Sequence, residues 1–488
     1  MKNFKRILLY TLTISIGLVS CQEFETDLEV ENLENPNDVI LASDPVALEA
    51  TAGNILNSWY MTVHSTSGPG AAMQTMADVS TCSWGNFGMR DLSSEPRVAF
   101  NNTTGYGNNV TRSYFNSLYS LLTDSNTLVA AVESDTEFDN PEMILMMGKM
   151  GQALSIGYLS LVFDRVWVYD AEGPIGENET GETDYATAMA YALDRLDEAI
   201  AIAEGSSFTL PETWLPGVNA TSSKMAEILN SFAARLLVCN VRNSQEKGNI
   251  NWNRVLAYTN DGINEDFDIT MDDITWYDLI PKTYLVYPGW GKVDMRIVNL
   301  LDPSMPDYWT NDLNTLPEAN SPDARLETDY EYTSSNSFSP DRGLYHFSNY
   351  RYSRLDDYIT EWTIPVTEFS KSELDMYKAE ALLNLNDLNG AASVVNSSTR
   401  TTRGNLPNVA ANASEIFDAI FYERMIEFAY TGMGLSFFEM RKEDLLQEGT
   451  LLHFPVPGSS LDAIPEEYYT YGGSSGDAGL DYSNGGWR

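Results

Sequence analysis

Apolar side chains recur every three or four residues through most of this chain, and that spacing most strongly constrains its fold. Four such stretches lie between Phe115 and Cys239, another begins at Asp44, and two more cover 371–397 and 414–430. This spacing puts the apolar residues on one face of a helix, which must be buried against a neighbour. The sequence therefore predicts a mainly α fold of helix hairpins that resemble tetratricopeptide units, although no 34-residue repeat is evident.

Two long stretches lack this periodicity. Residues from about 65 to 110 are rich in Gly, Ser, Thr and Asn, and residues from about 262 to 366 are rich in Trp, Tyr, Pro, Asp and Asn. Loops of this length are uncommon in a compact domain unless they serve a function. We therefore expect one α-helical domain over 44–488, with a large irregular, aromatic-rich insertion and a ligand-binding face built from these two stretches.

The N-terminus has the layout of a secretion signal. Lys2, Lys5 and Arg6 precede an apolar run over 7–19, and Cys21 follows a Leu-Val-Ser sequence. The run is too short for a membrane span of about 20 residues. The pattern is typical of a bacterial lipoprotein, with residues 1–20 as signal peptide, Cys21 as the lipidated residue and 21–43 as an acidic tether. A plain secretory signal with a coincidental cysteine is the alternative.

Composition limits the partners of the chain. With 29 basic and 70 acidic residues, the formal net charge is −41, which repels phosphate backbones and argues against nucleic-acid binding. Only two cysteines, Cys82 and Cys239, follow Cys21, so the chain is no disulfide scaffold. Cys239 is expected in a helix core and Cys82 in a segment that could be exposed, and a bond between them stays open.

Known catalytic motifs are missing from the sequence. Glu423 and Glu427 lie one helical turn apart beside Arg424, with Arg441 further on; they read as an acid/base pair or, as we favour, a buried ion-pair network. No cofactor and no catalytic metal site is expected. A structural Ca²⁺ site is an alternative to a solvated loop in one acidic segment, which holds Asp266, Asp268, Asp272 and Asp273.

The C-terminal region carries the most specific sequence patterns. Residues 423–432 read ERMIEFAYTG, residues 437–441 read FFEMR, and residues 455–465 read PVPGSSLDAIP. These stretches are similar to the ERxxEfafeGxrxxDlxR and PIPxsEidaNP patterns of the SusD/RagB-type outer-membrane lipoproteins. The chain departs from those patterns at three positions. Glu439 replaces an Asp, Ser460 replaces an acidic residue, and Ile464 replaces an Asn.

This resemblance implies a function as well as a fold. Members of the family are lipid-anchored at the surface of the outer membrane, bind nutrients, usually oligosaccharides, and pass them to a TonB-dependent SusC-like transporter. They are not enzymes. The resemblance therefore implies a glycan ligand, a transporter partner and a lipid anchor in the outer membrane.

Sugar recognition needs flat aromatic faces together with polar groups for the hydroxyls. Two segments qualify, because aromatic and polar residues cluster within them outside the helical pattern. Trp84 and Trp290 are the strongest candidates, because the glycines beside them indicate exposed turns. The predicted ligand-binding residues are Asp78, Trp84, Asn86, Arg90, Trp276, Tyr287, Trp290 and Trp309. Three other functions stay open: a peptide-binding lipoprotein of the same type, a glycoside hydrolase, and a structural surface protein.

Overall fold

The helices begin where local capping chemistry predicts. The computed structural model describes residues 44–82, 86–103, 105–134, 136–170, 182–278, 287–288, 291–308, 316–333, 348–474 and 481–487. Helix α3 (Pro45–Val63) starts directly after Asp44, with proline in its first turn. The Asp184 carboxylate caps α8 (Tyr185–Gly205) by accepting two backbone N–H groups, and the Thr221 hydroxyl caps α9 (Ser222–Cys239).

The other long helices match the predicted periodic stretches, so the expectation of a mainly α fold is confirmed. Additional short helices occur in places where the sequence shows no clear periodicity. The remaining helices are α4 (Gly70–Met76), α5 (Met89–Ser93), α6 (Gly105–Glu133), α7 (Pro141–Val162), α10 (Ser244–Lys247), α11 (Trp252–Asn260), α12 (Met295–Leu301), α13 (Arg325–Asp329), α14 (Asp356–Thr360), α15 (Lys371–Asn384), α16 (Leu388–Ser397), α17 (Thr399–Thr402), α18 (Ala413–Ile426), α19 (Leu435–Lys442) and α20 (Gly458–Ala463), with a 3₁₀ turn η1 at Asn86–Gly88.

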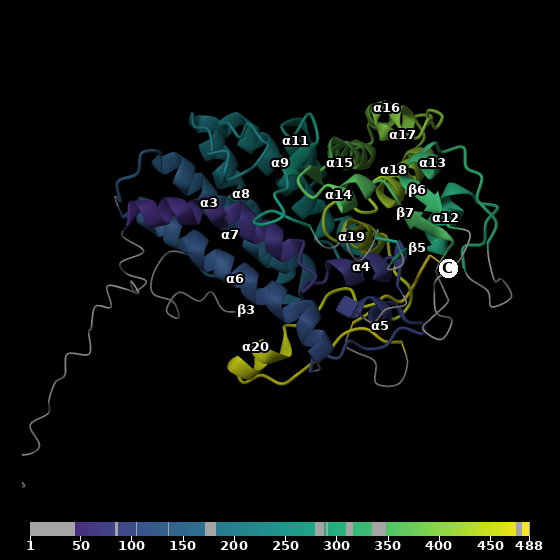
Figure 1. Ribbon diagram of the computed structural model, residues 1–488, viewed down its shortest axis with the longest axis horizontal. Coiled ribbons are helices and arrows are strands. Elements are labelled where there is room, and N and C mark those ends of the chain that lie inside the picture. The colour runs from purple at the N-terminus through teal and green to yellow at the C-terminus, as the bar shows by residue number, and fades with distance from the viewer. Residues whose placement is uncertain are drawn as a thin grey trace, which may run out of the picture. The chain divides into compact units, whose positions relative to one another are not determined.

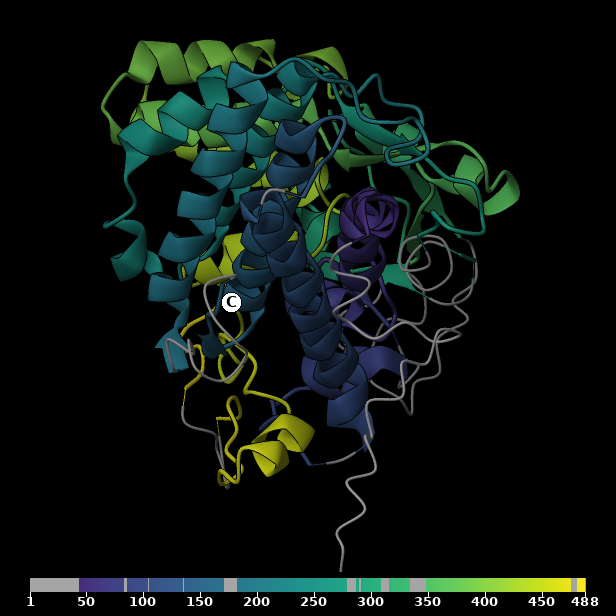
Figure 2. The same cartoon turned by 90° about the vertical axis from the view of Figure 1, so that its left-hand side faces the viewer.

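Consecutive helices pack on one another from α6 to α9, and α3 lies against α6 and α7 (Figure 1). Seen from the end, α3 lies beside the blue helices of this group (Figure 2). The close contact of α6 and α7 depends on glycine. A Cβ added at Gly151 would lie 2.1 Å from the Ser125 hydroxyl oxygen and 3.0 Å from Ile55. A larger residue on this face of α7 would therefore push neighbouring side chains apart.

The strands are short and pair over long distances in the sequence. In the described part of the chain they form four two-stranded antiparallel sheets. Strand β4 pairs with β8, which brings the start of the insertion beside its end. The pairs are β1 (Ser80–Thr81) with β5 (Lys292–Val293), β2 (Arg165–Trp167) with β3 (Glu182–Asp184), β4 (Phe267–Thr270) with β8 (Pro365–Phe369), and β6 (Tyr330–Tyr332) with β7 (Tyr350–Tyr352).

The two stretches expected to be irregular are only partly so. Helices α4 and α5 and the start of α6 fall within 65–110, and α12, α13 and α14 fall within 262–366. Apart from α6, these helices are too short to show a repeated apolar face, because five to seven residues complete at most two turns. The insertion is therefore an assembly of short helices and two-stranded sheets.

Two buried arginines join the ends of three helices. Neither arginine side chain is paired with a carboxylate among the described residues. The Arg441 guanidinium of α19 donates to the carbonyls of Leu161 at the end of α7 and Cys239 at the end of α9, at 3.0 and 2.8 Å. Arg242 donates to the carbonyls of Ser160 and Phe163, at 2.5 and 3.1 Å. Carbonyls at helix C-termini lack partners within the helix and carry the negative end of the helix dipole, so they suit a cation.

Residues 45–488 make one compact unit, and the predicted signal peptide, Cys21 and the tether lie outside the described residues. No described helix has the length and apolar character that crossing a membrane requires. Cys82 and Cys239 are both buried, and in the described part of the chain no disulfide joins them. The exposure suggested for Cys82 is wrong, because this residue is covered at the end of β1.

Candidate ligand-binding site

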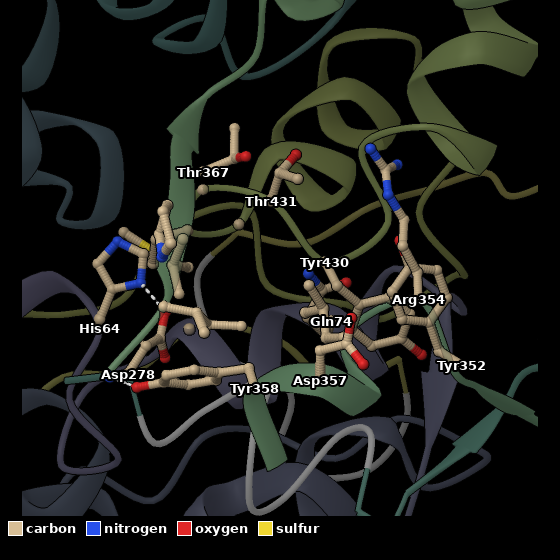
Figure 3. A pocket seen from close by; sticks show the side chains of 18 residues that line it. His64, Gln74, Asp278, Tyr352, Arg354, Asp357, Tyr358, Thr367, Tyr430 and Thr431 are labelled. Carbon is tan, nitrogen blue, oxygen red and sulfur yellow. Dashed lines mark hydrogen bonds and ion pairs between the residues drawn. The ribbon is translucent and has the colours of Figure 1, made fainter. Parts of the chain in front are cut away.

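A cavity of about 190 Å³ opens between α4, α14 and β8 (Figure 3). Its wall residues come from four stretches of the chain, 64–74, 278, 352–367 and 430–434, and β8 and the turn after α18 each contribute several of them. The wall residues used below are His64, Gln74, Asp278, Tyr352, Arg354, Leu355, Asp357, Tyr358, Ile364, Val366, Tyr430, Thr431 and Met433. Most residues of the inner wall are buried, so the cavity leads into the interior of the protein.

A charged histidine forms part of this inner wall. The His64 ring nitrogen Nδ1 lies 2.7 Å from the Asp278 carboxylate, and Nε2 lies 2.7 Å from the Glu368 carboxylate. A carboxylate accepts hydrogen bonds, so both ring nitrogens carry a proton and the ring is an imidazolium. Burial disfavours this charge, but Asp278 and Glu368 outweigh it and raise the pKa of His64 to about 10. The ring also stacks on Tyr60, with centroids 4.1 Å apart.

The charges continue behind the histidine in an alternating series. Arg235 donates to Glu368 at 2.6 Å and to both oxygens of Glu373 at 2.8 Å. Burial raises the pKa of Glu368, but Arg235 and His64 more than offset it, so the net effect is a lowered pKa. Each charge of the series thus has an opposite charge beside it, which a buried ionic group requires. The series fixes α9, β8 and α15 around the cavity, and its own carboxylates, Glu368 and Glu373, are occupied by His64 and Arg235.

Two polar atoms beside the cavity have no hydrogen-bond partner among the described residues. They are the Gln74 side-chain oxygen Oε1 and the Thr431 hydroxyl oxygen, and both atoms are buried. Leaving a buried polar group unpaired costs about 1–3 kcal/mol. A ligand that donates hydrogen bonds at these two positions would recover that free energy.

The remaining walls are aromatic and aliphatic. Tyr352 and Tyr430 pack with ring centroids 4.1 Å apart, and the Tyr358 hydroxyl accepts a hydrogen bond from the Asp278 backbone N–H. Arg354, the arginine among the described residues of the cavity wall, is paired with Glu427 at 3.0 Å. Asp357 is exposed at the entrance. The cavity therefore offers apolar surface and two unpaired neutral groups.

Two of the predicted ligand-binding residues are buried and hold the fold together. Asp78 accepts hydrogen bonds from Arg97 at 3.2 Å and from the Trp487 indole N–H at 2.6 Å. Trp276 is 2% exposed and packs on Tyr60. Neither side chain presents a face to solvent, so the interpretation of these two residues as ligand contacts is corrected to a structural role.

The other predicted ligand-binding residues are either at the surface or outside the residues that the structure describes. The Arg90 side chain is 41% exposed beside Asp91, and Tyr287 is 46% exposed. Asn86 begins the turn η1. Trp84, Trp290 and Trp309 lie outside the described residues, and their role as ligand contacts stays a prediction.

The acidic segment considered for Ca²⁺ uses its carboxylates within the protein. Asp272 accepts backbone N–H groups from Ile274, Thr275 and Trp276, which helps to lower its pKa. Asp266 caps the start of α15, and Asp268 accepts from Thr367. Among the residues the structure describes, no group of three or more His, Cys, Asp or Glu side chains is placed to hold a metal ion.

The glutamates that resemble an acid/base pair belong to a buried ion-pair network, as favoured from the sequence. Arg325 donates to Glu423 at 2.6 and 2.9 Å and to Glu427 at 3.0 Å, and it also binds Asp323. Burial is the main cause that raises the pKa of Glu423. The same burial keeps the side chain away from any substrate, because it is fully enclosed by the protein. The neighbouring Arg424 pairs with Glu380 and Glu439 instead.

Trp362 is an exposed aromatic residue that the sequence patterns do not select as a candidate ligand contact. Among the described residues it is the tryptophan with the most exposed surface, at 41%. It lies between α14 and β8, and both elements contribute residues to the cavity wall. In the sequence it is a single tryptophan between polar residues in a short link. Such a residue indicates a ligand-binding site less strongly than the clusters of aromatic residues elsewhere in the chain.

Comparison with known proteins identifies the architecture. No family model and no curated protein matches the sequence. A SusD superfamily protein from Parabacteroides distasonis is similar in structure, with a TM-score of 0.57 and 12% identity over 86% of this chain and 97% of that chain. The chain has the SusD-like fold. The resemblance expected from the C-terminal patterns is thereby confirmed in the fold.

Two further structures bear on ligands. A SusD-like carbohydrate-binding protein from Bacteroides fragilis has a TM-score of 0.57 and 13% identity over 82% of this chain and 86% of that chain. A third protein was crystallised with a xylogluco-oligosaccharide, and it matches with a TM-score of 0.54 and 11% identity over 89% of this chain and 91% of that chain. At these identities the likeness establishes the fold.

Proposed function

We propose that this protein binds an oligosaccharide or polysaccharide without cleaving it and delivers it to a TonB-dependent, SusC-like transporter. In this proposal Cys21 carries a lipid that anchors the chain in the outer membrane, facing outside. The fold supports the proposal, because SusD-like carbohydrate-binding proteins share it over more than four fifths of this chain. Lipidation of Cys21, the membrane location and the transporter contact rest on the sequence patterns.

One observation in the structure carries the binding function. The cavity combines tyrosine rings and aliphatic side chains with two buried polar atoms that lack partners. Ligand pockets in general have this composition, with mostly apolar walls and a few polar groups that fix orientation. Sugars present both kinds of surface, since their rings have C–H faces and hydroxyl edges.

The charged groups argue for binding over hydrolysis. Glycoside hydrolysis needs two carboxyl groups on either side of the scissile bond, one of them able to donate a proton. Of the pair of glutamates considered from the sequence, Glu423 has a pKa raised by burial, but its side chain is fully buried and both its oxygens accept hydrogen bonds from Arg325. It therefore has no access to a substrate.

Affinity electrophoresis of the chain that starts after Cys21 tests the proposal. The protein is run through gels that contain neutral or acidic polysaccharides, and release of reducing ends is measured in parallel. We expect slower migration in at least one polysaccharide and no release of reducing ends. Release would show an enzyme, and unchanged migration with all polysaccharides would favour a peptide ligand.

A tryptophan substitution links the binding to this face of the protein. Trp362→Ala is expected to weaken retardation, because contact between the C–H face of a sugar ring and the indole face is lost. The matched control is Tyr468→Ala, since Tyr468 is 49% exposed beside α20, away from α14 (Figure 1). Equal retardation of both variants and the unaltered protein would remove Trp362 from the binding face.

A further inference from the structure

We infer that the cavity between α4, α14 and β8 holds a single, uncharged sugar unit at the end of a glycan chain. The inference rests on the proposed function and specifies which part of the glycan this site recognises. The size of the cavity limits what it can hold. The cavity measures about 190 Å³, below the roughly 300–1,000 Å³ of pockets for drug-sized ligands. One ring with its hydroxyl groups is therefore the appropriate occupant, and a run of several sugar units is too large.

The position of the cavity selects a chain end. Its inner wall is made by buried residues, with exposed fractions of 7% for His64, 4% for Gln74 and 1% for Tyr358. Exposed Asp357 marks the entrance. A sugar unit within a polymer has a neighbour on each side, and both connections need room to leave the site. A terminal unit has one connection and can enter a cavity that leads into the interior.

The unpaired polar atoms define the chemistry of the occupant. The Gln74 oxygen only accepts hydrogen bonds, and the Thr431 hydroxyl accepts or donates. Together they call for a ligand with at least one hydrogen-bond donor, and hydroxyl groups along the edge of a sugar ring meet that requirement. Leu355, Ile364 and Val366 supply apolar surface for the C–H groups of the ring.

The charges of the described residues around the cavity favour a neutral sugar over an acidic one. The carboxylates of Asp278 and Glu368 occupy both N–H groups of His64. Arg354 already has Glu427 at 3.0 Å, a carboxylate that it shares with Arg325 and Arg403, and Asp329 at 3.9 Å. Each cation among the described residues that line the cavity therefore has a carboxylate beside it that a uronic acid or a sulfate group would have to displace. Asp357 at the entrance adds a repulsive charge. A buried anion without a partner is strongly disfavoured, so the neutral sugar is selected.

Substitution of the two unpaired groups separates binding from folding. Gln74→Met and Thr431→Val each remove a polar atom that has no partner in the unliganded protein, with little change in volume. We expect stability to be maintained or raised, while the affinity for a neutral oligosaccharide falls about three- to tenfold, the equivalent of one hydrogen bond. A purely structural role would change stability without this loss. Gln447→Met is the matched control, because Gln447 is also buried and its side-chain nitrogen is also unpaired, beside a different cleft.

Calorimetric titration tests the inference with malto-, cello- and xylogluco-oligosaccharides, and with oligogalacturonate as the acidic probe. The expected result is binding of at least one neutral oligosaccharide, competition by a neutral monosaccharide, no binding of oligogalacturonate, and weaker binding by both cavity variants only. Unchanged affinity of both variants, with the neutral oligosaccharide still bound, would overturn the inference and leave the proposed function standing. Preference for oligogalacturonate would overturn the neutral-sugar selection. Binding of none of the four probes would count against both.

Discussion

The imidazolium of His64 should make stability depend on pH in the alkaline range. Its two carboxylate partners, each 2.7 Å away, hold the pKa at about 10 in the folded protein, against an ordinary value of 6.5. Because the folded pKa is the higher one, the proton stabilises the folded state. This stabilisation is fully present below pH 6.5, declines as the unfolded chain alone loses its proton, and is gone above about pH 10.

The size of the effect follows from the two pKa values. At about 1.4 kcal/mol per pH unit, the interval between 6.5 and about 10 corresponds to at most about 5 kcal/mol. The ring is 7% exposed, so solvent screens the interaction little. The perturbation is His64→Gln, which keeps a hydrogen-bonding side chain and removes the titrating group. Tyr60, Asp278 and Glu368, which surround the ring, remain in place.

Equilibrium urea unfolding at intervals from pH 6 to pH 10.5 measures this difference. Tyrosine and lysine residues titrate in both proteins, so the informative quantity is the unfolding free energy of the unaltered protein minus that of His64→Gln. We expect this difference to be largest near pH 6 and to fall by several kcal/mol up to pH 10. Parallel pH profiles for the two proteins would refute the charged state of His64.

Two further predictions concern stability. Arg325→Gln should lower the unfolding free energy by about 3–5 kcal/mol, because it leaves buried carboxylates without a counter-ion, whereas Arg254→Gln, at a pair with side chains 31% and 48% exposed, should lower it by less than about 1 kcal/mol. Similar losses in urea unfolding would contradict the importance of burial. Gly151→Ala should destabilise by about 1–3 kcal/mol through contact with the Ser125 side chain. Gly205→Ala, where a Cβ meets nothing within 4 Å, should leave the thermal midpoint unchanged or slightly raised, and equal midpoints for the two variants would argue against the close contact of α6 and α7.

Sequence reasoning succeeded where the deciding interactions are local. The start of α3 after Asp44 and the helices α6 to α9 depend on caps and on apolar spacing within one segment, and both can be read from neighbouring residues. The short helices α12 and α14 give too few turns for such a pattern. Their positions depend on packing against distant parts of the chain, which a single sequence does not display.

The binding site was less predictable for a related reason. An aromatic residue in an irregular segment is equally compatible with a ligand-binding platform and with a local core, and Trp276 belongs to the core because it packs on Tyr60 from α3. The cavity unites His64, Gln74 and Thr431, which are separated by up to several hundred residues. His64 and Gln74 lie in no motif, and Thr431 lies inside the C-terminal pattern at 423–432, which does not mark it as a cavity residue. The position that the three share appears only when the fold brings them together.

The two arginines at the helix ends have a consequence for acid conditions. The salt bridges of His64, Arg235 and Arg325 lose their attraction once their carboxylates are protonated. The partners of Arg441 and Arg242 are main-chain carbonyls, which do not take up protons at any pH that proteins experience. The hydrogen bonds of these two arginines at the junction of α7, α9 and α19 therefore do not weaken in acid through protonation of their acceptors. As pH falls, the ion pairs that Arg235 and Arg325 make with carboxylates weaken first, and the carbonyl contacts of Arg441 and Arg242 persist.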